Sequence, residues 1–96
     1  MPDAPDLDPV LHQTVRTRIA AVFEQRKEIS FSELKTVLSI TDGNLDAHLR
    51  KLSAAGYLHS RFVLTGARPH TLYSLSSSGR KAWRAYVRDM RRLLQS

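Results

Sequence analysis

The sequence between positions 38 and 58 is LSITDGNLDAHLRKLSAAGYL, and it carries a complete set of helix signals. Thr41 can accept hydrogen bonds from the free amides of a first helical turn. Gly56 can adopt the left-handed conformation that ends a helix. Three leucines recur at helical spacing and would form one buried stripe: Leu45, Leu49 and Leu52. We therefore predict a helix over about residues 42–55 with a single apolar face.

The opposite side of this helix carries small, polar and basic residues, given about 100° of rotation per residue. A helix that enters a DNA major groove needs small side chains for close approach, amides for base edges and cations for guanine or phosphate. Asn44 could pair with adenine, and Arg50 could reach guanine or phosphate. The first-turn amides could also accept a phosphate. The candidate DNA-binding residues of this helix are Thr41, Gly43, Asn44, Ala47, His48, Arg50 and Lys51.

Two acidic residues on the same helix weaken this interpretation. Asp42 and Asp46 would lie near the DNA surface and would repel phosphates. Asp46 can also pair with Arg50 at the i, i+4 spacing, which would occupy that arginine in the free protein. The alternative interpretation is a solvated polar face on an ordinary helix.

A β-hairpin is predicted directly after the helix. Residues 57–63 and 70–75 are rich in β-forming residues, and the segment 64–69, LTGARP, holds turn residues. Arg61 and Arg68 flank this segment. An arginine at a loop tip can enter a minor groove or lie on phosphate, whereas the alternative is a surface arginine on a turn. We expect the core-facing residues to be Leu58, Phe62, Leu75 and either Leu72 or Tyr73, with the register left open.

The remaining elements are set by helix caps. Asp8 followed by Pro9 predicts the start of a first helix that extends to about residue 26. Residues 29–31 fit a minimal strand, because Ile29 and Phe31 alternate about a serine. Ser32 is predicted to cap a second helix that turns Leu34, Val37 and Leu38 inward.

Ser76 is predicted to cap a final helix over residues 77–95. The resulting order is α-β-α-α-β-β-α, an α+β fold that is mainly helical. We expect one domain over residues 9–96, preceded by a flexible acidic lead at residues 1–8.

The charge distribution favours a polyanionic partner. The 96-residue chain has a formal net charge of +6, and no Asp or Glu occurs between positions 47 and 88. A one-sided basic field attracts nucleic acid, although excess charge can also serve solubility alone. The sequence has no cysteine, which excludes disulfides and thiolate metal sites. With no membrane-length apolar run and no signal-peptide pattern, we expect a cytoplasmic protein.

The two terminal helices carry more apolar surface than one small core requires. We therefore expect the helices at residues 9–26 and 77–95 to build a two-fold homodimer, with DNA half-sites roughly 34–36 Å apart. The alternative is that Trp83 and Tyr86 cover the hairpin. A small-molecule effector between these helices stays open, although no polar constellation supports one. The residues assigned to the dimer interface are Leu7, Val10, Leu11, Trp83, Tyr86, Val87, Met90, Leu93 and Leu94.

The other faces of the last helix carry arginines, which we interpret as a solvated surface rather than as a second DNA contact. They are Arg80, Arg84, Arg88, Arg91 and Arg92.

No pattern indicates an enzyme. The four histidines, at positions 12, 48, 59 and 70, have no metal-ligand spacing, and the chain has no HExxH motif, glycine-rich phosphate loop or nucleophile elbow. We therefore expect no catalytic residue, no metal and no cofactor.

Several segments together resemble the winged helix-turn-helix domains of small bacterial and archaeal transcriptional regulators, most of all the compact MarR/ArsR-like group. These segments are FSEL at 31–34, TDGNL at 41–45, LRKLSAAGYL at 49–58, RPHT at 68–71, YSLS at 73–76 and SGR at 78–80. The resemblance covers about residues 9–94. It implies a cytoplasmic homodimer that binds operator DNA, with the third helix as the recognition helix and Arg68 on the wing.

The chain departs from that family pattern in its wing. The family often has a lysine-rich wing, whereas this hairpin carries only Arg61 and Arg68. The charge pattern, the predicted elements and the family resemblance together predict one function. It is sequence-specific binding of double-stranded DNA as a homodimeric transcriptional regulator. The recognition helix at about 42–55 would enter the major groove, and the wing at 64–69 would contact the backbone or minor groove. The alternative is a winged-helix protein-interaction module with only non-specific DNA affinity.

Overall fold

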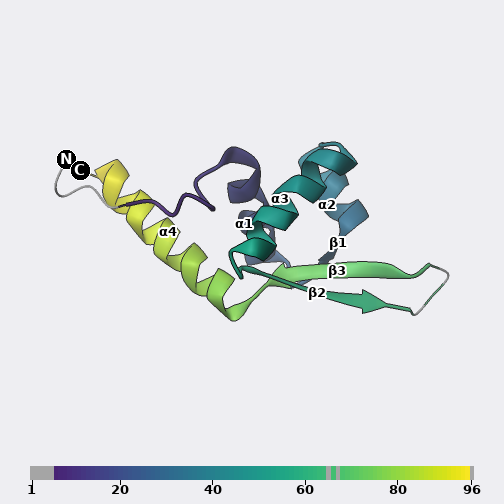
Figure 1. The fold of residues 1–96 in the computed structure, drawn as a ribbon. Helices are drawn as coiled ribbons and strands as arrows, with labels where there is room; N and C mark the ends of the chain where they lie inside the picture. The colour runs from purple at the N-terminus through teal and green to yellow at the C-terminus, as the bar shows by residue number, and fades with distance from the viewer. Residues whose placement is uncertain (1–5, 65, 67, 96) are drawn as a thin grey trace.

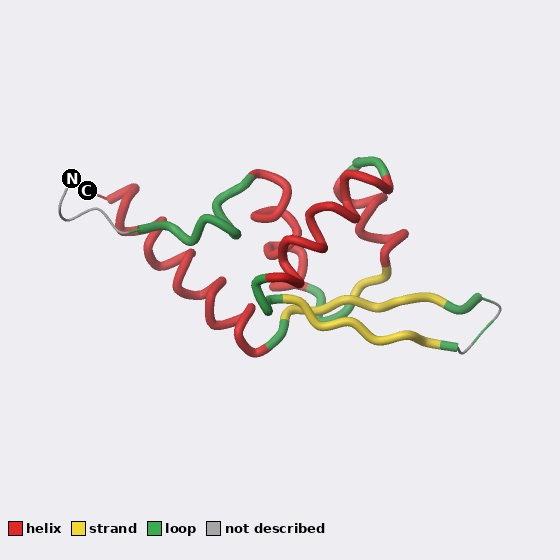
Figure 2. The backbone as a smooth tube through the Cα atoms, in the orientation of Figure 1, coloured by secondary structure: helices red, strands yellow, loops and turns green. Residues whose placement is uncertain are grey.

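The structure is a computed structural model that describes residues 6–64, 66 and 68–95. Three helices pack over one face of a small sheet, while α4 and the hairpin extend in opposite directions from this body (Figure 1). The long axis of the molecule measures 54 Å against 25 Å and 23 Å for the others. The elements are α1 (Thr14–Gln25), β1 (Ile29–Ser30), α2 (Phe31–Leu38), α3 (Asp42–Ala54), β2 (Leu58–Val63), β3 (His70–Leu75) and α4 (Ser77–Gln95), and Figure 2 shows them along the chain.

This order confirms the predicted α-β-α-α-β-β-α architecture. In the part of the chain that the structure describes, none of the helices is both long enough and apolar enough to cross a membrane.

The three strands form an antiparallel sheet in the order β1-β3-β2. Leu58 pairs with Leu75, and Tyr73 lies between Ser60 on β2 and Ile29 on β1. Because paired residues share a face, this register places Tyr73 rather than its neighbour on the helix-covered side. Ile29 and Leu75 are buried there.

Phe62 was expected to be buried and is instead 63% exposed. Its pairing with Thr71 puts it on the same face of the sheet as Leu58 and Leu75, so its predicted direction was correct. The hairpin, however, runs on past the helices at this point (Figure 1), and no apolar layer covers it there.

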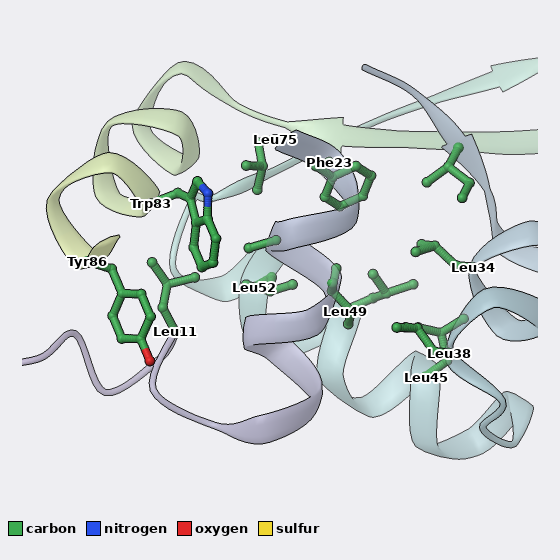
Figure 3. Packing of buried hydrophobic residues seen from close by; sticks show 13 residues of the cluster. Leu11, Phe23, Leu34, Leu38, Leu45, Leu49, Leu52, Leu75, Trp83 and Tyr86 are labelled. Carbon is green, nitrogen blue, oxygen red and sulfur yellow. The ribbon is translucent and has the colours of Figure 1, made fainter. Parts of the chain in front are cut away.

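The core is one contiguous cluster drawn from every helix and from two strands. Figure 3 shows Leu11, Trp83 and Tyr86 gathered at the α4 end of this cluster and Leu34 and Leu38 at the α2 end. The predicted leucine stripe of α3 is confirmed, because its three members are at most 4% exposed: Leu45, Leu49 and Leu52. The buried side of α3 therefore packs onto α1 and α2.

The first helix begins at Thr14, five residues later than the predicted start at Pro9. Asp8 does cap a turn, since its carboxylate accepts a hydrogen bond from the Val10 amide at 2.8 Å, but the helix does not continue from that turn. The chain bends after it, which buries Leu11 completely, and Gln13 becomes the N-cap of α1.

The second helix is capped by Ser30 rather than by Ser32. Ser30 Oγ accepts from the Glu33 amide, and the Glu33 carboxylate accepts from the Ser30 amide in return. This reciprocal pair of hydrogen bonds satisfies two free backbone donors. Ser30 is therefore a better N-cap than Ser32, which has no such partner three residues later. Leu34 and Leu38 set the inward direction of α2, and Val37 lies about 60° from Leu34 on the side away from Leu38. Val37 is therefore 53% exposed, contrary to the expectation that it faces inward.

The caps predicted for the last two helices are confirmed. Thr41 Oγ1 accepts from the Asn44 amide at 3.2 Å, and Gly56 leaves α3 with a positive φ of 79°. Ser76 Oγ accepts from the Gly79 amide at 2.9 Å at the start of α4.

Gly79 lies where α4 crosses closest to the chain that leaves α3. A Cβ at this position would overlap the backbone carbonyl of Tyr57, which already accepts a hydrogen bond from the Ser76 amide at 2.9 Å. Because the obstacle is backbone, no side-chain rotation can relieve it. Only glycine lets α4 start so close to the end of α3.

We predict that Gly79→Ala lowers the free energy of unfolding by about 3 kcal/mol, because α4 must move away from Tyr57. Thermal unfolding followed by circular dichroism should show a midpoint lower by roughly 10 °C or more. Gly43→Ala is the matched control: a Cβ there meets nothing within 4 Å, and alanine should stabilise α3 by up to about 1 kcal/mol. Equal effects of the two substitutions would contradict the close approach at Gly79.

Candidate nucleic-acid interface

The outward side of α3 is a continuous exposed surface. Burial of the leucine stripe turns the remaining faces of the helix to solvent. His48 is half-buried at the margin, and the other candidate residues of this helix are all exposed: Thr41, Gly43, Asn44, Ala47, Arg50 and Lys51. The structure thus brings the predicted residues of α3 together on one surface.

Both acidic residues of α3 are held in ion pairs. Asp46 accepts from Arg50 Nε at 2.9 Å, as the i, i+4 spacing predicted, and Asp42 accepts from Lys35 of α2 at 2.8 Å. These pairs are exposed, and exposed pairs contribute little to stability. The Arg50 side chain, 80% exposed, can therefore exchange its carboxylate for another acceptor.

His48 is held by Arg16 of α1, a contact that the sequence pattern did not reveal. Arg16 Nη1 lies 3.1 Å from His48 Nδ1, and Arg16 Nε donates to the Val10 carbonyl at 2.5 Å. A guanidinium has only donors, so Nδ1 must accept and the ring proton lies on Nε2. Burial, and then the Arg16 charge, lower the pKa of His48 below its ordinary value. The lowered pKa and the contact with Arg16 both favour the neutral imidazole, with its proton on Nε2.

The two hairpin arginines have different surroundings. Arg61 donates two hydrogen bonds to the Glu28 carboxylate, at 2.6 Å from Nε and 2.8 Å from Nη2. These bonds hold the pKa of Glu28 below its ordinary value. Arg68 is exposed, and its carbonyl accepts from His70 Nδ1 at 2.9 Å. Residues 65 and 67 of the predicted wing lie outside the described residues.

Glu28 was missed at the sequence level because it stands thirty-three positions from Arg61. The strand order brings them together: Glu28 directly precedes β1, and Arg61 pairs with Leu72 on the strand between them. In the sequence, only the position of Glu28 directly before a short predicted strand hinted at this ion pair.

Three residues assigned to the dimer interface are buried in the chain's own core: Leu11, Trp83 and Tyr86. The indole of Trp83 donates to Glu24 at 2.9 Å, and the Tyr86 hydroxyl lies 2.9 Å from His12 Nδ1. These aromatic side chains therefore join α4 to α1 and to the segment before it. Their polar atoms are paired within the chain itself.

The other residues assigned to the interface are more accessible. Leu7, Val10, Val87 and Met90 are partly buried and pack against the core cluster. Leu93 is 38% exposed and Leu94 is 77% exposed. The accessible apolar surface of α4 thus lies in its last turns. Among the described residues, no group of three or more His, Asp or Glu side chains could hold a metal ion.

Comparisons with known proteins agree with this geometry. A family model described as a winged helix DNA-binding domain matches residues 15–94. An uncharacterised protein of Methanocaldococcus jannaschii is 30% identical over 84 residues, which cover 88% of this chain and 91% of that protein.

Solved structures show the same fold. A transcriptional regulator homologue from Pyrococcus horikoshii OT3 matches with a TM-score of 0.83 and 27% identity, covering 90% of this chain and 85% of that one. A MarR-family regulator from Enterococcus faecalis V583 matches with a TM-score of 0.70 and 21% identity, covering 79% and 68% of the two chains.

These matches confirm the resemblance that the sequence suggested. They also agree with a DNA-binding protein rather than an enzyme. Because the family model matches most of the length of this chain, the chain belongs to the winged helix DNA-binding domain family.

Proposed function

We propose that this protein is a homodimeric transcriptional regulator that binds a specific double-stranded DNA sequence. The observation that carries the proposal is the exposed polar face of α3, on which the small residues Gly43 and Ala47 lie beside Asn44 and Lys51. Small residues allow close approach to base edges, while the amide and the cation supply base and phosphate contacts. The similar regulator homologue from Pyrococcus horikoshii supports a role in transcription.

Within this proposal the contacts divide by chemistry. Asn44 and Arg50 read bases, and His48 adds a neutral donor at the edge of the same surface. Lys51 contacts phosphate. On the wing the exposed Arg68 makes the backbone or minor-groove contact, whereas Arg61 is occupied by Glu28 and mainly fixes the base of the hairpin.

Selection of bound sequences from a random DNA pool tests the proposal. A specific homodimer should enrich one motif with two-fold symmetry, whose half-sites lie roughly 34–36 Å apart. A protein-interaction module would bind DNA weakly and enrich no motif. Retention of all sequences equally would therefore refute the proposed function.

Substitutions should separate base reading from backbone contact. We predict that Asn44→Ala and Arg50→Ala each reduce the preference for the selected motif by about 1–3 kcal/mol, because each removes a base contact. Arg68→Ala should weaken the selected and a scrambled duplex by the same factor. Fluorescence anisotropy on both duplexes measures this, and identical behaviour of all three variants would contradict the division of roles.

The dimer is proposed to form through the last turns of α4, where Leu94 projects into solvent. We predict that Leu94→Glu shifts the protein from dimer to monomer in sedimentation at micromolar concentration, because a carboxylate would be buried without a partner. Leu64→Glu is the matched control, since Leu64 is similarly exposed at 73% but is the first residue of the wing, away from α4. A wild-type protein that sediments as a monomer would refute the dimer.

A further inference from the structure

The positive charge of this protein lies on α4 and not on the recognition helix. Helix α4 contains six basic residues and one acidic residue, so it alone carries +5 of the chain's net +6. Helix α3 contains two basic and two acidic residues, so its formal charge is zero. Attraction of a polyanion must therefore draw mainly on α4.

The basic residues of α4 form one face. At about 100° per residue they fall within roughly 120° of one another, and the buried residues Trp83 and Tyr86 lie outside this sector. All six side chains are exposed: Arg80, Lys81, Arg84, Arg88, Arg91 and Arg92. We call this surface the arginine face.

Helix stability does not account for the arginine face. Arg80, Arg84, Arg88 and Arg92 follow one another at i, i+4, and each such like-charge pair destabilises a helix by about 0.2–0.5 kcal/mol. In the part of the chain that the structure describes, the one ion pair on this face joins Arg88 to Asp89 at 3.4 Å. In the rest of the described chain more of the cations have a carboxylate partner. Four of them are held in ion pairs: Arg26, Lys35, Arg50 and Arg61.

The arginine face borders a groove that is separate from α3 and the hairpin. A cavity of about 390 Å³ lies between α1 and α4 and is lined by Arg84, Arg88, Arg91 and Arg92. Trp83 and Val87 also line it, as does Glu24, whose carboxylate already accepts from the Trp83 indole. Among the described residues, its lining includes none from α3 or the hairpin.

From Arg80 to Arg92 the helix rises about 18 Å, which is long enough to follow a run of phosphates on a duplex. An anionic membrane is a poorer match. A helix that lies on a membrane inserts its apolar face. The core occupies that face of α4 at Trp83 and Tyr86, and its accessible apolar residues are confined to the last turns, at Leu93 and Leu94.

The sequence alone favoured a solvated surface for these arginines. From their placement on one face of the structure, we propose instead that the arginine face of α4 is a second DNA contact, which binds the phosphate backbone without sequence preference and outside the segment read by α3. This inference rests on the proposed DNA-binding function. It assigns the base preference to α3 and most of the salt-dependent affinity to α4.

The test is a salt titration of DNA binding by the full chain. Arg84→Gln combined with Arg88→Gln removes two charges from the arginine face. The control is Arg18→Gln combined with Arg26→Gln, which removes two exposed arginines from α1 and its C-terminal end. The probes are the selected duplex and a scrambled duplex of about 40 bp, or four helical turns. Sedimentation of each variant checks that association is unchanged.

We expect the double variant on α4 to reduce the slope of log K against log salt by about 3.6, because each protomer of the proposed homodimer loses two phosphate contacts and each contact contributes about 0.9. Its preference for the selected duplex should stay at the wild-type ratio, and the control variant should keep the wild-type slope. An unchanged slope would overturn the inference about α4 while leaving the proposed function intact. Failure of the wild-type protein to bind any duplex would instead overturn the proposed function itself.

Two further results would also count against the arginine face as a DNA contact. One is a double variant that loses binding to phosphatidylserine vesicles but keeps its DNA slope, because the partner would then be a membrane. The other is an altered sedimentation coefficient, because weaker DNA binding would then follow from lost association.

Discussion

Burial of the α3 leucine stripe is the constraint on which the rest of the structure depends. Leu45, Leu49 and Leu52 fix the rotation of the helix about its axis, because each would lose about 2–5 kcal/mol of packing if it were truncated. With that rotation fixed, the polar residues have one direction left to face. The caps at Thr41 and Gly56 set the length of the surface they form. The candidate interface is therefore a consequence of core packing and of the helix caps.

In this account, affinity for DNA and selectivity among DNA sequences depend on two different surfaces of the molecule. A neutral recognition helix has little attraction for phosphates as such, so its binding depends on matched contacts to base edges. The cationic surface lies instead on α4, where a like-charged ladder opposes helix formation. The ion pairs Asp46–Arg50 and Asp42–Lys35 strengthen this division, since a base or phosphate must displace a carboxylate before either cation is released.

Local signals were readable from the sequence, and long-range ones were not. Helix α3 was predictable because its cap at Thr41, its apolar spacing and its terminator at Gly56 all lie within one short stretch. The direction of Phe62 followed from strand alternation, but its exposure depends on how far the helices extend over the hairpin. The Glu28–Arg61 pair depends on strand order, which one sequence does not encode locally. The same holds for the terminal helices, whose apolar residues were partly assigned to a partner although the chain's own core buries several of them.

The most direct measurement is amide chemical-shift mapping of the isotopically labelled protein during titration with the selected duplex. The largest changes should occur at Asn44, Ala47 and Lys51 on the outward side of α3, with smaller changes along the arginine face of α4. Val37, exposed on α2, should keep its free-state shift. Perturbations that spare α3 and fall on the exposed apolar residues of α2 or the hairpin would show that the leucine stripe does not turn a DNA-reading surface outward.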